Sequence, residues 1–227
     1  MVSYRPIAYL LDVDNAVLDN DRIQQDLKDH LKRAYGRDAS VRYWSILENP
    51  FSEPGCRDYL GALRRFRAER PREVELLSLS SYFIDHSFAG RLFPSALEVL
   101  QRLNEFGPGV ILSDGNVVSG LFDAVDGHVL VCVHKEAALD DVERRFPAEH
   151  YVLFGDKLRI LAAAKRYWGN RITTVSPRQG RYAHDPRMVG ALPPADVTIE
   201  RIGDLLGFDL TRLWPAPISA SSLEQAR

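Results

Sequence analysis

The sequence predicts an α/β protein, in which a parallel β-sheet is flanked by helices and carries a small all-helical domain. Short apolar runs alternate with longer segments of helical period, which is the βαβ pattern. The runs are apolar throughout, as expected of strands that are buried on both faces. About 75 residues after the first run contain helical patterns and almost nothing that resembles a strand. This interval predicts the helical domain.

Six apolar runs are the predicted strands of the sheet. They cover residues 7–12, 109–114, 128–133, 150–156, 171–176 and 195–199. The main predicted helices cover residues 21–36, 57–69, 94–107, 135–146 and 157–169. In the first of these helices, the apolar face is predicted to consist of Ile23, Leu27, Leu31 and Ala34.

The predicted domain boundaries follow from these patterns. Residues 1–18 and 91–213 are expected to form the core that contains the sheet, and residues 19–90 a helical cap inserted after the first strand. The last segment, 214–227, is polar and rich in Pro and Ser, so we expect it to be a disordered tail.

Composition and charge exclude several classes of protein. The chain carries 29 basic and 31 acidic side chains and a net charge of −2, so neither nucleic acid nor an anionic membrane is expected as a partner. The apolar runs are too short for a signal peptide or a transmembrane helix, and we expect a cytoplasmic protein. Cys56 and Cys132 suggest neither a disulfide framework nor a metal site. The sequence leaves the oligomeric state open, a homodimer included.

Polar side chains follow four of the predicted strands. They are Asp12 and Asp14 after the first strand, Ser113 and Asp114 after the second, Lys135 past the third and Asp156 after the fourth. Ligands of open parallel sheets bind in the crevice beyond the carboxyl ends of the strands, so we expect these side chains to meet there. Together they can bind a metal ion and a phosphate.

The chemistry of this set points to phosphoryl transfer. Asp12 and Asp14 raise the cost of ionising each other unless a cation lies beside them. Mg²⁺ suits such a place, because it takes one or two carboxylates, here Asp12 and Asp156, and keeps several waters. Asp12 could then attack phosphorus while Asp14 moves the proton. Ser113 would donate a hydrogen bond to a phosphoryl oxygen, and Lys135 would supply positive charge.

The same residues lie in segments that resemble the motifs of a known family. In chain order, the segments are LLDVDNAVLDN, VILSDGN, the lysine of VCVHKEAALDD, and YVLFGDKLRIL. They resemble the four motifs of the haloacid dehalogenase superfamily of hydrolases, with a helical cap between the first and the second, over about residues 7–200.

The resemblance implies a fold and an activity. It implies a Rossmann-like core, Mg²⁺ dependence, and a phosphatase of the phosphoglycolate phosphatase type that acts on a small phosphorylated metabolite. Asp12 would be the nucleophile and Asp14 the acid and base. Metal contacts would come from Asp12, the backbone carbonyl of Asp14, and Asp156. The phosphate would be bound by Ser113, Asp114 and Lys135.

The branch of the superfamily is indicated by the second aspartate. Phosphatases carry Asp at this place and dehalogenases lack it, so Asp14 favours phosphate chemistry. Two features depart from the pattern: Asn15 and Ala16 stand where the family usually has Gly-Thr, and Asp156 lacks a second acid nearby. They motivate an alternative, a catalytically weakened or silent member that binds a ligand or partner. A phosphomutase or dehalogenase of the same superfamily is a third alternative.

Other residues have simpler interpretations. The first two aspartates, taken alone, also fit a polar turn. The cap carries Arg57, Arg64, Arg65, Arg67, Arg70 and Arg72. They could recognise a second anionic group of the substrate, but interleaved acids favour a solvated helix face. The segment 176–186 is interpreted as a surface loop.

Overall fold

A computed structural model of the chain describes residues 5–48, 59–70, 79, 82, 88–113, 119–132, 135, 138–184 and 192–215. The chain divides into two compact units, which are residues 1–21 with 89–227, and residues 22–88. We call them the α/β unit and the helical unit. Within the described ranges, no helix is both long and apolar enough to cross a membrane.

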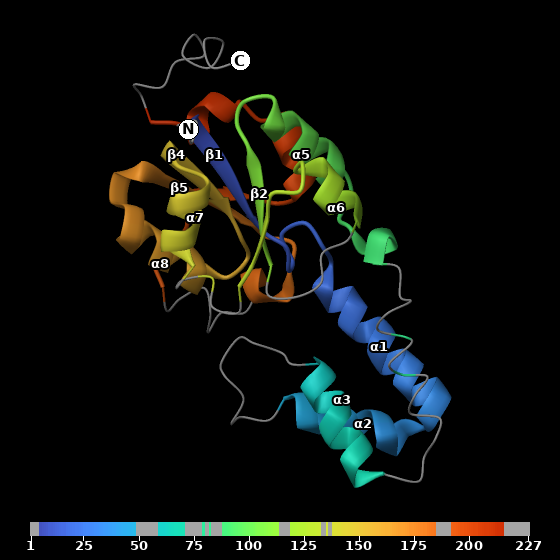
Figure 1. Ribbon diagram of the computed structural model, residues 1–227. Helices are drawn as coiled ribbons and strands as arrows, with labels where there is room; N and C mark the ends of the chain where they lie inside the picture. The colour runs from blue at the N-terminus through green and yellow to red at the C-terminus, as the bar shows by residue number, and fades with distance from the viewer. Residues whose placement is uncertain are drawn as a thin grey trace. The chain divides into compact units, whose positions relative to one another are not determined.

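The sheet of the α/β unit has six parallel strands in the spatial order β3-β2-β1-β4-β5-β6 (Figure 1). Their bounds are β1 Arg5–Asp12, β2 Gly109–Ser113, β3 Val129–Val131, β4 Ala148–Phe154, β5 Ile172–Pro177 and β6 Val197–Ile199. Each predicted strand is present, and the predicted fold class is confirmed. The third and sixth are shorter than predicted.

Strand β1 occupies the centre of the sheet between strands from distant parts of the chain. It pairs with β2, where Asp12 aligns with Leu112, and with β4, where Leu11 aligns with Phe154. Residues 7–11 are fully buried, which explains why this run is apolar on both faces. Because all strands are parallel, the carboxyl ends of β3, β2, β1 and β4 follow one another along one edge of the sheet.

Helices cover both faces of this sheet. Their bounds are α5 Ala96–Asn104, α6 Ser119–Ala124, α7 Leu139–Arg145 and α8 Leu158–Trp168. Helices α7 and α8 bury Val142 and Trp168 in one hydrophobic cluster with Leu10 of β1. Helix α5 buries Leu100 and Leu103, and it lies with α6 on the opposite side of the sheet in Figure 1. Short 3₁₀ helices are Phe88–Arg91, Gly169–Arg171, Arg181–His184, Ile202–Leu206 and Leu210–Leu213.

The core of the α/β unit extends to Trp214. This side chain is buried, and its indole Nε1 donates a hydrogen bond of 3.0 Å to the hydroxyl of Tyr9 in β1. The segment predicted to be a disordered tail begins at this residue. Trp214 therefore belongs to the packed structure, and residues 216–227 lie outside the described residues.

The helical unit contains three described helices. Their bounds are α1 Asn20–Tyr35, α2 Arg37–Leu47 and α3 Tyr59–Glu69, and α1 begins within the α/β unit. Leu27 and Leu31 of α1 are buried as predicted, together with Gln24. Ala34 is exposed, contrary to the predicted apolar face, because the buried stripe ends one turn earlier.

Aromatic side chains form much of the core of the helical unit. Tyr43 of α2 meets Phe66 of α3 edge to face, with ring centroids 5.8 Å apart. The hydroxyl of Tyr43 donates a hydrogen bond of 2.9 Å to the carbonyl oxygen of Tyr59. These contacts join α2 to α3 and satisfy the one polar atom of the buried ring.

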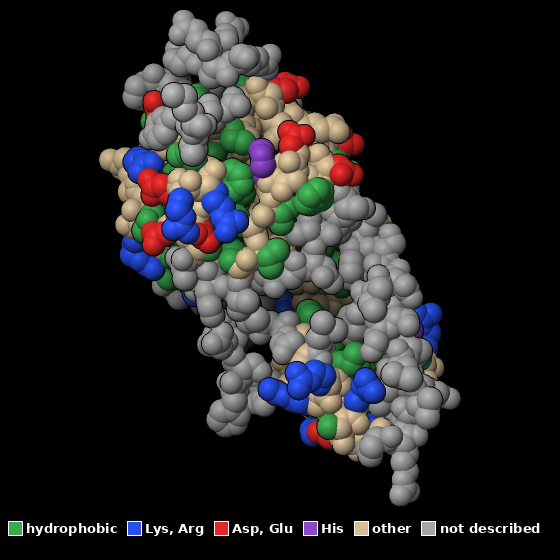
Figure 2. Space-filling model, viewed as in Figure 1, with side chains coloured by type: hydrophobic (Ala, Val, Ile, Leu, Met, Phe, Trp, Pro, Cys, Tyr) green, Lys and Arg blue, Asp and Glu red, His purple; other side chains and the backbone are tan. Residues whose placement is uncertain are grey.

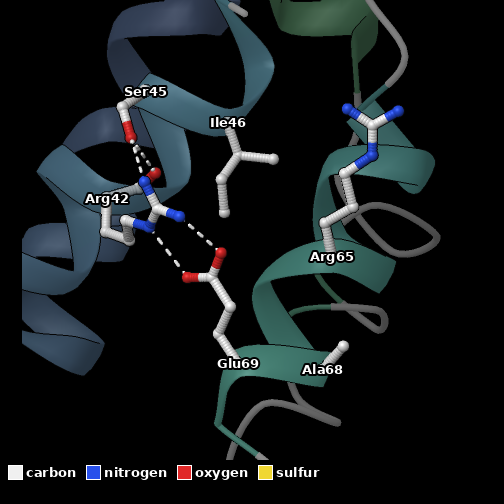
Figure 3. Close-up of a pocket in the computed structure, with 6 residues that line it drawn as sticks. All are labelled: Arg42, Ser45, Ile46, Arg65, Ala68 and Glu69. Carbon is white, nitrogen blue, oxygen red and sulfur yellow. Dashed lines mark hydrogen bonds and ion pairs between the residues drawn. The ribbon is translucent and has the colours of Figure 1, made fainter.

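The surface of the helical unit is basic on the face shown in Figure 2, where Lys and Arg outnumber acids among its coloured side chains. A groove of about 550 Å³ lies between α2 and α3, and Figure 3 shows its lining. The lining residues are Arg42, Ser45, Ile46, Arg65, Ala68 and Glu69. Within it, the guanidinium of Arg42 makes two hydrogen bonds, of 2.8 and 2.5 Å, to the Glu69 carboxylate. This charge is therefore already paired.

The contact between Tyr9 and Trp214 gives a prediction about the end of the chain. Tyr9→Phe and Trp214→Phe each leave one buried polar group without its partner, so each should lower the free energy of unfolding by about 1–3 kcal/mol. The double variant should lose less than the sum by about 1 kcal/mol, because the hydrogen bond is lost only once. Urea unfolding of the four proteins measures this. Strict additivity would contradict the contact.

Candidate active site

Asp12 ends the central strand and has two oxygens in different surroundings. Its Oδ1 accepts a hydrogen bond of 2.5 Å from the ammonium of Lys135, and the two groups form an ion pair. Its Oδ2 is buried and has no hydrogen-bond partner among the described residues. One oxygen is thus held in place while the other is left for a ligand.

Lys135 lies beyond β3, at the place the sequence predicted for a site cation. Asp12, Ser113, Lys135 and Asp156 are each at most 3% exposed. A buried ammonium is costly unless a carboxylate compensates it, and Asp12 does so here. The pair therefore joins a residue near the edge of the sheet to one at its centre.

Asp156 follows β4 and shares the site with Asp12. The intervening Gly155 lies against Asp12, since a Cβ added to this glycine would be 3.5 Å from the Asp12 Cβ. Both carboxylate oxygens of Asp156 are buried without a hydrogen-bond partner in the described part of the chain. Burial and the charge of Asp12 raise the pKa of Asp156 to about 7, although Lys157 and the nearby Asn15 amide oppose the shift.

Asp14 lies closer to solvent and faces a cation that the sequence analysis did not single out. Its Oδ2 is 3.7 Å from the ammonium of Lys157, with 20% and 15% of the two side chains exposed. Burial lowers the pKa of Lys157, but the charges of Asp12 and Asp14 more than offset this and raise it above its usual value. The lysine in FGDK was readable in the sequence, yet nothing in its spacing revealed that it faces Asp14.

Ser113 ends β2 beside the central strand. Its side chain is buried, and its carbonyl oxygen accepts a hydrogen bond of 2.7 Å from the backbone amide of Cys132. Strand pairing therefore fixes the backbone of Ser113 at the same edge as Asp12. Asp114, predicted to bind phosphate, lies outside the described residues.

The donor set fits a hard divalent cation. Both carboxylate oxygens of Asp156 are buried without a hydrogen-bond partner within the described residues, and the carboxylate of Asp12 lies in the same surroundings. No group of three or more His, Cys, Asp or Glu in these residues is arranged to hold a metal. Mg²⁺ commonly uses only one or two carboxylates and completes its shell with water, so the two aspartates suit it better than they suit zinc.

A structural neighbour identifies the family. A haloacid dehalogenase-like hydrolase of Burkholderia xenovorans is 51% identical, with a TM-score of 0.86. The match covers 93% of this chain and 100% of that one. The chain belongs to the haloacid dehalogenase superfamily. Comparison with models of protein families and with curated proteins gives no match.

More distant members of the superfamily share the fold. The hydrolase YfnB of Bacillus subtilis, in a structure bound to magnesium, is 16% identical over 89% of this chain and 98% of its own, with a TM-score of 0.57. The L-2-haloacid dehalogenase of Xanthobacter autotrophicus is 18% identical over 90% and 98%, with a TM-score of 0.50. These similarities concern the fold alone.

The haloacid dehalogenase motif after β1 is altered at Asn15, and the structure explains how the change is accommodated. Asn15 has φ of 54°, a left-handed conformation that Gly adopts freely and Asn tolerates better than most residues. Its side-chain Oδ1 accepts hydrogen bonds of 3.1 and 3.3 Å from the amides of Asn20 and Asp21. Asn15 thus stands where the family usually has Gly, in a conformation that Gly adopts freely, and it stabilises the start of α1.

The loop after β5 forms hydrogen bonds with the turn that contains Asn15 and with the start of α1. The Gln179 side chain donates a hydrogen bond of 2.7 Å to the carbonyl oxygen of Ala16 and accepts one of 3.0 Å from the amide of Ile202. Arg181 donates its backbone amide to Asp21 and forms an ion pair with the same carboxylate. Gln179 and Arg181, in the segment 176–186 that was interpreted from the sequence as a surface loop, thus position the loop that carries Asp14. No local pattern indicated this role.

The raised pKa of Asp156 predicts how stability changes with pH. Folding raises this pKa from 3.8 to about 7, so the contribution of Asp156 to the stability of the metal-free protein should fall as pH rises between these values. The side chain in Asp156→Asn cannot ionise. The free energy of unfolding of this variant, relative to that of the wild type, should therefore rise by about 1.4 kcal/mol per pH unit in this range and then level off. Urea unfolding with a chelator present, from pH 4 to 8, measures the difference. A constant difference would contradict the raised pKa.

Gly180 provides a test of the contact between the two loops. A Cβ at this position would lie 2.4 Å from the Cβ of Asn15, so Gly180→Ala must displace one loop. We expect it to lower the free energy of unfolding by about 1–3 kcal/mol. Gly90→Ala is the matched control, because an added Cβ there meets no described atom within 4 Å. Equal melting temperatures for the two variants would show that the loops do not touch.

Proposed function

We propose that this member of the haloacid dehalogenase superfamily is a Mg²⁺-dependent phosphohydrolase. It cleaves a small phosphate monoester through an aspartyl-phosphate intermediate on Asp12. The surroundings of Asp12 carry the proposal: Oδ1 is fixed by Lys135, while Oδ2 is unpartnered among the described residues and shares its surroundings with Asp156. A carboxylate held by one oxygen is oriented to attack with the other.

The proposed reaction has two displacements at phosphorus. Asp12 Oδ2 forms a bond to phosphorus as the bond to the ester oxygen breaks, and Asp14 gives that oxygen a proton, so a neutral alcohol leaves. Water then attacks the aspartyl-phosphate and loses a proton to Asp14. The bond between Asp12 and phosphorus breaks, which releases inorganic phosphate and restores both aspartates.

Other residues stabilise charge in this proposal. Lys135 neutralises Asp12 before attack, and Ser113 donates a hydrogen bond to a phosphoryl oxygen. Asp12, Asp156 and the backbone carbonyl of Asp14 would hold Mg²⁺, which supplies positive charge to the phosphate when bound. The helical unit inserted after β1 is proposed to act as the cap that excludes water during transfer.

Asp14 favours an alcohol over a halide as the leaving group. An alcohol leaves as a strongly basic oxygen unless it is protonated, and Asp14, two residues after the nucleophile, is suited to supply that proton. A halide is a weak base and needs no acid. Dehalogenases of the superfamily lack an aspartate at this place, so Asp14 supports the phosphatase over the dehalogenase alternative.

Replacement of the nucleophile gives the direct test. Asp12→Asn should reduce phosphate release from an aryl phosphate by at least about a thousandfold, since an amide side chain cannot form the aspartyl-phosphate intermediate. The amide in Asp12→Asn can still accept the hydrogen bond from Lys135 but leaves the buried ammonium without its counter-charge, so the variant should melt at a lower temperature than the wild type. Far-ultraviolet circular dichroism at the assay temperature checks that it is still folded. Phosphate release is measured with and without Mg²⁺.

The same preparation separates the alternatives. A panel of phosphomonoesters without turnover in the presence of Mg²⁺ would overturn the phosphatase proposal. Halide release from 2-haloacids would then identify a dehalogenase, and movement of phosphate to a second position of a sugar phosphate would identify a mutase. Inactivity in all three assays would support a silent binding protein.

A further inference from the structure

Lys157 belongs to the site but has no part in the reaction described above. Its backbone carbonyl accepts a hydrogen bond of 2.9 Å from the amide of Ile160, which fixes its main chain at the start of α8. Its ammonium can only donate hydrogen bonds and so cannot cap the first amides of this helix. It lies 3.7 Å from the Asp14 carboxylate, so its contact in the site is one of opposite charges.

Among the described residues, the charges at this edge of the sheet are close to balanced. Three described carboxylates, those of Asp12, Asp14 and Asp156, face two described ammonium groups, those of Lys135 and Lys157. With all five ionised, the net charge of the group is −1. The Lys135 ammonium is committed to Asp12 at 2.5 Å, whereas Lys157 makes a looser contact with a partly exposed side chain. Lys157 is therefore the cation that can move.

We propose that Lys157 is a built-in competitor of the divalent cation. When the ion is absent, the ammonium of Lys157 compensates the charge of the aspartates. When the ion binds, it and the ammonium repel each other, so the affinity for the metal is lower than it would be without the lysine. The inference rests on the proposed function, because it concerns the same carboxylates. The site then fills only at high free Mg²⁺, and its occupancy follows the concentration of that ion.

Removal of the charge should strengthen metal binding. In Lys157→Met the four remaining charges sum to −2, and we expect the dissociation constant of Mg²⁺ to fall by about tenfold, or about 1.4 kcal/mol. Lys157→Arg keeps the charge and should bind Mg²⁺ as the wild type does. Arg166→Met removes a charge from an exposed position of the same helix, about 13 Å further along at 1.5 Å per residue, and should also leave binding unchanged. Isothermal titration with Mg²⁺ measures all four proteins.

Thermal unfolding gives a second readout that needs no turnover. Without metal, Lys157→Met should melt about 2–6 °C below the wild type, because the aspartates lose their compensation. Saturating Mg²⁺ should abolish this deficit. A residue that only supported the fold would weaken Mg²⁺ binding when replaced and would keep its deficit at saturation.

The outcomes separate this inference from the proposed function. Tighter binding by Lys157→Met, including binding that appears only in this variant, supports the competition. Equal or weaker binding overturns it, while phosphate release by the wild type with Mg²⁺ would leave the phosphatase proposal standing. If none of the four proteins binds Mg²⁺, both the competition and the metal-dependent reaction are overturned.

Discussion

The buried ion pair between Lys135 and Asp12 is the interaction on which the rest of the site depends. Two charges removed from water are tolerated only when each compensates the other, and loss of either one leaves the other buried and unpaired. Asp156 adds a third buried charge beside this pair, and its raised pKa reflects the cost. The edge of the sheet therefore concentrates unfavourable electrostatics, which the apolar interior around β1 offsets.

An electrostatic cost of this kind is typical of a functional site, because a site optimised for stability alone would not bury three carboxylate oxygens that have no hydrogen-bond partner among the described residues. The surrounding loops limit what the charged groups can do to relieve it. Gln179 ties the carbonyl of Ala16, and Asn15 holds the first amides of α1. The aspartates consequently keep their places instead of turning toward solvent.

Much of this arrangement was predictable from the sequence, for physical reasons. Short runs that are apolar throughout and alternate with helical segments indicate parallel strands, and parallel strands bring their carboxyl ends to one edge. The position of Asp12 at the end of β1 and of Asp156 beyond β4 follows from this alone. Contacts made by flexible side chains were not predictable. The fold brings Lys157 to Asp14 and Gln179 to Ala16. The separation of these residues in the sequence does not indicate either contact.

The central place of β1 in the sheet has a consequence for how the chain acquires its structure. This strand is made first, but its partners β2 and β4 begin about 100 and 140 residues later. Pairs so far apart in sequence close slowly, and until they close an apolar strand is without its neighbours. During synthesis, β1 is therefore an apolar segment exposed to aggregation until its partners emerge, and chaperones that cover it would assist folding.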